Sequence, residues 1–294
     1  MQLDIVFRGL RAPLRLVGAE AVGALLPKVA PGWPHEVRAA DPAARPFLTI
    51  RARPDSPLFD CESHVEPAPP RQLDPVNAVC DAMAALAQAW PAEDARLICL
   101  HAAGVEMAGR LVVFPNVRRA GKSTLSAALA RAGHRVFSDD VLPLSFSDGF
   151  AARGLAMGVA PRLRLPLPPV LPGPFRAWAE ATSGPANAQY KYLTLPGQPG
   201  QGEALPVGAF VILDRQEGAG PARLDPVSPD AAMDALLHQN FTRDRHSADI
   251  LEAMAACLAA RPVLRLAYSD LGSAVACLEA AFSRWADPAP AVAA

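Results

Sequence analysis

The sequence predicts an α/β protein, and two observations carry this prediction. Residues 96–107, 110–115 and 134–145 are apolar segments with the composition of buried strands. Between the second and the third, residues 121–132 have the pattern of a helix that follows a glycine-containing loop. Strand, glycine loop, helix and strand in this order is typical of a nucleotide-binding α/β unit.

The N-terminal part predicts a smaller α/β domain over residues 1–94. Residues 3–7 and 47–53 alternate in apolar character and predict strands, and residues 19–26 predict a short helix. Residues 54–75 are dense in proline, which favours a linker or an edge strand. A longer helix is expected to begin with Asp74 as its N-cap and to end at Pro91.

The rest of the chain predicts a larger domain over residues 95–286. The Asp148-Gly149 pair predicts a hairpin turn. Residues 160–205 are rich in proline and glycine and predict long surface loops, which often carry substrate contacts. The elements expected after them are a strand at 206–215, helices from Ser228 to Asn240 and over 246–260, a strand at 262–269, a helix at 271–285 and a disordered tail at 287–294.

Composition narrows the class of protein. A net charge of −1 over 294 residues argues against a general nucleic-acid binder. No charge-free apolar run has the roughly 18 residues that cross a bilayer, and the N-terminal residues lack the pattern of a signal peptide. Scattered cysteines and histidines, without a C-x-x-C pair, favour reduced thiols and no zinc site. We therefore expect a cytoplasmic protein with no membrane or nucleic-acid partner.

The segment PNVRRAGKST (115–124) has the pattern of a phosphate-binding loop. In such a loop, backbone N–H groups and a helix N-terminus surround the phosphates, a lysine contacts their oxygens, and a hydroxyl holds Mg²⁺. Lys122 takes the lysine position, and Gly121 lets the backbone come close. Ser123 takes the hydroxyl position, with Thr124 as a substitute. The pattern therefore predicts ATP and Mg²⁺ as ligands.

The loop departs from this pattern at its first position, where Asn116 stands in place of glycine. Glycine there permits unusual backbone dihedrals, and asparagine enters the left-handed region more readily than most residues. We therefore interpret Asn116 as a tolerated left-handed turn residue. Ala120 belongs to the same loop. Arg118 and Arg119 either add positive charge at the γ-phosphate or are solvated loop arginines.

The segment Ser138-Asp139-Asp140 lies in the C-terminal part of the next apolar segment. Strand ends border the ligand crevice in open α/β sheets. Of two neighbouring carboxylates, one can hold Mg²⁺, a role that suits Asp139, while the other accepts a proton from an incoming hydroxyl. Which of Asp139 and Asp140 is the base stays open, and a plain surface turn is the alternative interpretation.

Together these residues resemble the HPr kinase/phosphorylase family, whose P-loop fold is shared with phosphoenolpyruvate carboxykinases. The similar segments are LHAAGV, NVRRAGKST and FSDDVLPL within residues 96–145. Weaker similarity extends to ARGLAMG (152–158) and RDRHSADILEAMA (243–255). The resemblance implies an ATP-dependent kinase acting on a serine-type hydroxyl, with a peptide or small protein as the substrate.

The resemblance also implies roles for residues outside the loop. It implies that His101 lies beside the active site, whereas His101 taken alone would be a strand histidine satisfied by backbone groups. Arg153 and Arg245 are weaker matches, and Arg245 would act across subunits in a homo-oligomer. The acid that the family has before its arginine-glycine segment is Ala151 here. The alternative is therefore a catalytically impaired nucleotide-binding partner in a peptide-modification or biosynthetic assembly.

Overall fold

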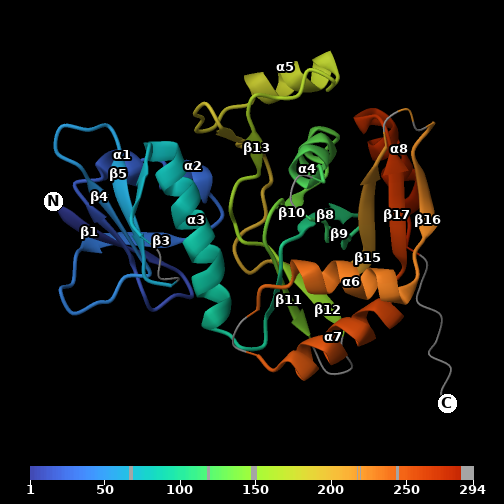
Figure 1. Ribbon diagram of the computed structural model, residues 1–294, viewed down its shortest axis with the longest axis horizontal. Coiled ribbons are helices and arrows are strands. Elements are labelled where there is room, and N and C mark those ends of the chain that lie inside the picture. The colour runs from blue at the N-terminus through green and yellow to red at the C-terminus, as the bar shows by residue number, and fades with distance from the viewer. Residues whose placement is uncertain are drawn as a thin grey trace.

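The computed structural model describes residues 1–65, 69–117, 120–146, 151–216, 218, 220–242 and 245–285. The protein is of the mixed α/β class, with a six-stranded sheet, a nine-stranded sheet and a separate pair of strands. Figure 1 shows the six-stranded sheet at one end of the molecule, with helix α3 (Pro75–Ala92) between it and the other elements. None of the helices in these ranges combines the length and the apolar character needed to cross a membrane.

The N-terminal layer, as we call residues 1–92, consists of the six-stranded sheet and three helices. The strand order is β3-β1-β2-β4-β5-β6, and only the β2–β4 pair is parallel. The strands are β1 (Gln2–Phe7), β2 (Leu14–Val17), β3 (His35–Ala39), β4 (Leu48–Ala52), β5 (Phe59–Ser63) and β6 (Arg71–Leu73). The short helices are α1 (Glu20–Gly23) and α2 (Leu26–Val29). Alternate apolar residues of the strands share one buried core with α1, α2 and α3.

Local sequence patterns predicted most of the helices and strands of the N-terminal layer. The strands predicted at 3–7 and 47–53 are confirmed as β1 and β4. The helix predicted at 19–26 is instead two single-turn helices, α1 and α2. The predicted N-cap of α3 is confirmed, since the Asp74 carboxylate accepts from the backbone N–H groups of Val76 and Asn77 at 2.9 and 3.2 Å. The proline-dense segment contains β5 and the edge strand β6.

The nine-stranded sheet forms the centre of the larger part of the molecule. Its main path is β10-β8-β9-β15-β12-β11-β7, and β17 pairs with both β15 and β16. The strands are β7 (Ile98–Leu100), β8 (Ala103–Met107), β9 (Arg110–Phe114), β10 (Val136–Ser138), β11 (Leu142–Phe146), β12 (Ala152–Leu155), β15 (Ala204–Arg215), β16 (Arg223–Pro226) and β17 (Val263–Tyr268). Helices α4 (Lys122–Arg131) and α8 (Leu271–Phe282) pack in one core, and α6 (Pro229–Gln239) and α7 (Ser247–Ala259) in another. Strand β9 contributes alternate residues to each core, so the sheet separates the two helix pairs.

Two apolar segments that predict single strands are each broken in the structure. Residues 96–107 divide into β7 and β8, and residues 134–145 divide into β10 and β11. Because β7 pairs with β11 while β8 pairs with β10, the two breaks lie beside each other. His101 lies in the first break, and Asp139 and Asp140 lie in the second.

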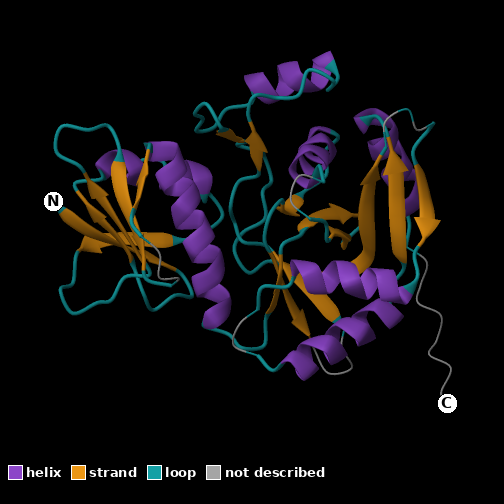
Figure 2. Cartoon of the chain, in the orientation of Figure 1, coloured by secondary structure: helices purple, strands orange, loops and turns teal. Residues whose placement is uncertain are grey.

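Residues 160–205 are more ordered than predicted. They contain β13 (Arg162–Arg164), α5 (Gly173–Ala181) and β14 (Tyr190–Tyr192), and β13 and β14 form an antiparallel hairpin. Figure 2 shows that long loops join α5 to the rest of the chain. The turn predicted at Asp148-Gly149 and the tail at 287–294 lie outside the described residues. The elements predicted from 206 onward are confirmed as β15, α6, α7, β17 and α8.

Candidate functional site

The candidate phosphate loop, residues 115–121, connects β9 to α4. Our interpretation of Asn116 as a left-handed turn residue is wrong. The described non-glycine residues with positive φ are Asp55 and Ala108, so the Asn116 backbone stays in an ordinary region. A different property of asparagine must explain its presence.

The Asn116 side chain extends the sheet. Its amide nitrogen donates to the Leu213 carbonyl at 3.0 Å, and its amide oxygen accepts from the Leu213 N–H at 2.9 Å. Val113 of β9 lies opposite Phe210 of β15, so Asn116 and Leu213 each lie three residues beyond that pair. Pro115 has no N–H to donate, and the Asn116 amide takes the place of a peptide group in the ladder. Asparagine therefore fixes where the loop leaves the sheet.

The other end of the loop turns into α4. Gly121 is the helix N-cap and adopts a left-handed backbone with φ of 97°. A Cβ on Gly121 would lie 3.1 Å from the Tyr268 hydroxyl, so glycine suits both the dihedral and the space. The buried Lys122 ammonium donates to the carbonyls of Asn116 and Val117 and so ties the two ends of the loop together. This leaves a positive helix N-terminus and an ammonium group at one place.

Ser138 connects the two strand breaks. Its hydroxyl donates to the Ala102 carbonyl at 3.2 Å and accepts from the Asp140 N–H at 3.1 Å. The His101 Nδ1 lies 3.0 Å from an Asp140 carboxylate oxygen, while the His101 N–H donates to the Gln239 carbonyl. The His101 ring therefore pairs with a candidate catalytic carboxylate.

Asp139 faces the start of α4. Its carboxylate accepts a hydrogen bond from the Arg162 N–H at 3.0 Å, and the Ser123 hydroxyl lies near enough to help lower its pKa. The Arg162 guanidinium lies 3.6 Å from the second carboxylate oxygen of Asp140. His101, Arg162 and both aspartates thus form one connected group, with Ser123 beside it.

The two carboxyl groups differ in their proton affinity. Burial, together with the neighbouring Asp140 charge, raises the pKa of Asp139 to about 6. Burial would also raise the pKa of Asp140, but its hydrogen bond with His101 and the charges of His101, Arg162 and Lys122 lower that pKa below its ordinary value. Asp140 is therefore the carboxylate that stays ionised most readily.

Several predicted site residues have no described contact to the group formed by His101 and the two aspartates. Arg118 and Arg119 lie outside the described residues. Ala120 and Thr124 are half-buried at the loop and in the first turn of α4. The described contacts of the other two arginines are to backbone carbonyls: Arg153 donates to Ala204 and Arg245 to Arg96. Arg245 lines a separate cavity of about 370 Å³ that none of the residues grouped above lines.

Two important partners were missed at the sequence level. Arg162 lies in a proline-dense stretch that predicted loops, although its Arg-Leu-Arg alternation is a weak strand signal. Leu213 acts through its backbone, so its residue type carries no signal. The pairing of β15 with β9 brings Leu213 to the loop, and Arg162 reaches Asp139 from the separate β13–β14 hairpin.

Comparison with known proteins adds little to this geometry. No protein-family model and no curated protein sequence matches the chain. Among solved structures it is similar to the Hpr(Ser) kinase/phosphatase from Coxiella burnetii, with 15% sequence identity and a TM-score of 0.27, over 58% of this chain and 85% of that one. A TM-score of this size carries no argument, so function rests on the residues of the site.

Proposed function

We propose that the protein binds Mg·ATP at the candidate phosphate loop, in the manner of a P-loop kinase, and transfers the γ-phosphoryl group to a serine-type hydroxyl of a peptide or small protein. The observation that carries this proposal is that Asp139 lies beside Ser123, in the first turn of α4. This proximity joins the helix N-terminus that suits phosphates to the carboxylate pair that suits transfer.

The donor set fits Mg²⁺. Ser123 and Asp139 offer a hydroxyl and a carboxylate, which are the hard oxygen ligands that Mg²⁺ takes alongside water and substrate phosphates. The described residues contain no cluster of three or more His, Cys, Asp or Glu side chains suited to a metal, so these two residues would hold the ion with help from the nucleotide. Mg²⁺ supplies neutralisation of the charge that develops on the phosphate oxygens.

The roles of the remaining residues follow from their contacts. Lys122 and the N–H groups at the start of α4 bind the phosphates. Asp140, whose side chain is 48% exposed, is open to an acceptor and is oriented by His101. During transfer the acceptor oxygen bonds to the γ-phosphorus, the bond to the bridging oxygen breaks, ADP leaves, and the hydroxyl proton passes to Asp140.

Calorimetric titration of Mg·ATP and hydrolysis of [γ-³²P]ATP, with water in place of the unknown acceptor, test this assignment. Lys122→Ala should weaken Mg·ATP binding about 10- to 100-fold, because hydrogen bonds between charged groups are lost. Asp140→Asn should keep binding and lower hydrolysis about 100-fold or more. Lys28→Ala is the matched control, since Lys28 is exposed in the N-terminal layer and should leave both measurements unchanged. Wild-type protein that fails to bind Mg·ATP would contradict the proposal.

A second candidate is a nucleotide-binding partner protein without turnover. Ala151 in place of the expected acid favours it, because it leaves Asp139 and Ser123 as the available metal ligands. The same experiment separates the two candidates. Binding that depends on Lys122, with no hydrolysis and no phosphoryl transfer to any peptide, would favour the partner protein.

A further inference from the structure

Arg162 touches both carboxylates of the candidate site by two different parts of the residue. Its backbone N–H donates to Asp139 at 3.0 Å, and its guanidinium Nη2 lies 3.6 Å from the Asp140 carboxylate. Substituting the side chain therefore removes the contact to Asp140 and leaves the contact to Asp139. The contact to Asp140 can therefore be tested while the backbone hydrogen bond to Asp139 is kept.

The Arg162 side chain is held against two aromatic rings. Its guanidinium carbon lies 4.5 Å from the ring centroid of Tyr190 and 5.9 Å from that of Tyr192. A cation over a ring face is attracted to it, and the contact limits the rotamers that the side chain adopts. Arg162 is 25% exposed, so the guanidinium approaches Asp140 from a fixed, largely covered position.

The N-terminal layer holds the hairpin that carries these rings. Tyr192 is buried in the core of that layer, and its hydroxyl donates to the Cys80 sulfur of α3 at 3.3 Å. The Asn187 amide donates to both carboxylate oxygens of Asp74, the N-cap of α3, at 3.0 Å. The position of Arg162 is therefore set by α3 as well as by the nine-stranded sheet.

We propose that Arg162 is a positioning residue for the transfer reaction, one that holds the Asp140 carboxylate together with His101 and leaves nucleotide binding to other groups. This inference rests on the proposed function. His101 and Arg162 approach different oxygens of Asp140, so the two contacts together fix the orientation of the carboxylate. A carboxylate held from one side alone would rotate about its terminal bond.

The geometry predicts a division between kcat and KM. In Arg162→Gln the Asp140 contact is lost, so the kcat of ATP hydrolysis should fall about 10-fold, as when a positioned acid–base group is loosened. The Asp139 contact uses the backbone, so the KM for Mg·ATP should change less than about 2-fold. Arg162→Lys keeps the charge and should recover part of kcat.

Arg164→Gln is the matched control. Arg164 lies on the same strand and also stacks on Tyr190, at 5.7 Å, yet it has no ion pair with an acidic residue in the described ranges. Loss of kcat in Arg162→Gln but not in Arg164→Gln would show that the contact to Asp140 matters. Equal loss in both variants, or none in Arg162→Gln, would overturn the inference.

A stability cycle tests the contact without relying on activity. Thermal unfolding is measured for Arg162→Gln, Asp140→Asn and the double variant, and again with Arg164→Gln in place of Arg162→Gln. The Tm shifts should be non-additive in the first cycle and additive in the second. Additive shifts in the first cycle would overturn the inference. Coupling in a protein that neither binds nor hydrolyses Mg·ATP would leave the contact intact and refute the proposed function.

Discussion

At the scale of single residues, Asn116 shows how one side chain replaces a piece of backbone. Its amide makes both hydrogen bonds that a peptide group would make with Leu213. The sequence suggested another role, in which Asn116 replaces a glycine because it tolerates a left-handed backbone. The two interpretations predict opposite effects of Asn116→Gly on stability.

Asn116→Gly should destabilise the protein by about 2–4 kcal/mol, because two buried backbone groups of Leu213 lose their partners. Were Asn116 merely a substitute for glycine, the change would be neutral or stabilising. Asn116→Asp keeps the acceptor for the Leu213 N–H but sets a carboxylate oxygen against the Leu213 carbonyl, so it should also destabilise the protein. Urea denaturation monitored by circular dichroism measures all three proteins.

Ser138 offers a second comparison at this scale. Ser138→Ala removes the link between the Ala102 carbonyl and the Asp140 N–H and should cost about 1–2 kcal/mol of unfolding free energy. Ser126→Ala is the control: the Ser126 hydroxyl is buried in α4 without a hydrogen-bond partner among the described residues. That change should be neutral or stabilising, since alanine also favours the helix. A larger loss in the Ser126 variant would contradict this account of the strand break.

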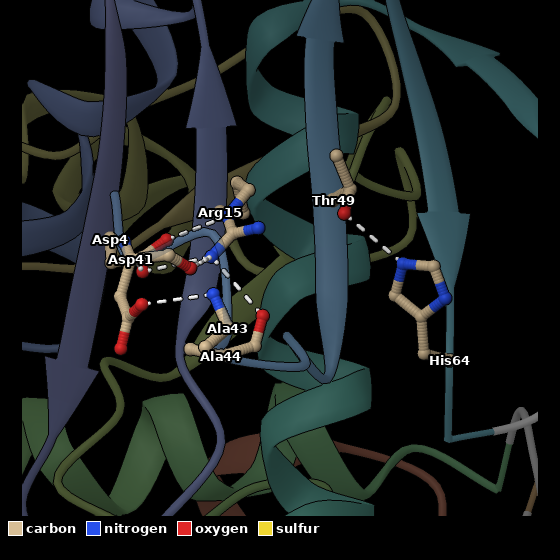
Figure 3. Close-up of polar contacts among 7 residues, drawn as sticks. All are labelled: Asp4, Arg15, Asp41, Ala43, Ala44, Thr49 and His64. Carbon is tan, nitrogen blue, oxygen red and sulfur yellow. Dashed lines mark hydrogen bonds and ion pairs between the residues drawn. The ribbon is translucent and has the colours of Figure 1, made fainter.

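At the scale of elements, strands β1 and β2 are joined by a buried ion pair on the sheet face opposite the helices. Asp4, which is fully buried, accepts from Arg15 at 2.8 and 3.0 Å, and the two residues are cross-strand neighbours. Figure 3 shows the loop at Asp41 and Ala44 closing over this pair, where the Asp41 N–H donates to Asp4 and both carbonyls accept from Arg15. A partly exposed ion pair in the same layer, between Arg53 and Asp60, offers a comparison.

Asp4→Ala should therefore cost about 3 kcal/mol, near the lower end for breaking a buried pair, since Arg15 keeps some access to solvent. Asp60→Ala breaks the partly exposed pair with Arg53 and should cost less than about 1 kcal/mol. Equal losses in the two variants, measured by chemical denaturation, would contradict this difference in burial.

The ion pair of Asp4 and Arg15 also predicts a pH dependence of stability. Burial opposes ionisation of Asp4, but hydrogen bonds from Arg15 and Asp41 and the charges of Arg15 and Arg38 lower its pKa below the ordinary value of 3.8. A lowered folded-state pKa contributes stability above the unfolded value, and this contribution is lost as the pH falls through the folded-state pKa. Wild type should lose more stability than Asp4→Ala between about pH 4 and pH 2. Parallel curves for the two proteins would rule out this role of Asp4.

The elements also show what the sequence could and could not predict. Helix α3 was predictable because its signals, Asp74 and the proline after it, act within one helical turn. The breaks at His101 and Asp139 were not, because the segments on both sides are equally apolar and their division depends on which strands they pair with. The loop and the aspartates could be proposed from local pattern, whereas Arg162 and the Leu213 partner of Asn116 depend on tertiary pairing.

At the scale of the whole molecule, the N-terminal layer is joined to the larger part by backbone contacts. The Gly32 N–H donates to the Gly158 carbonyl at 3.0 Å, and the Ala160 N–H donates to the Val29 carbonyl at 2.7 Å. Met157, Ala160 and Tyr192 belong to the core of the N-terminal layer. The division at residue 94 stays a prediction, and the joined core argues that the two parts unfold together.

Gly158→Ala tests this cooperativity. Gly158 has φ of 70°, and a Cβ there would lie 2.6 Å from the Gly32 carbonyl, so alanine adds backbone strain and a collision with a rigid neighbour. We expect a loss of about 2–5 kcal/mol, carried by a single calorimetric transition that moves as a whole. Gly202→Ala is the control, because Gly202 also has positive φ, at 80°, but nothing lies within 4 Å of its added Cβ. That variant should lose only about 1–2 kcal/mol. Two separate transitions, of which Gly158→Ala moves one, would instead mean that the N-terminal layer folds as an independent domain.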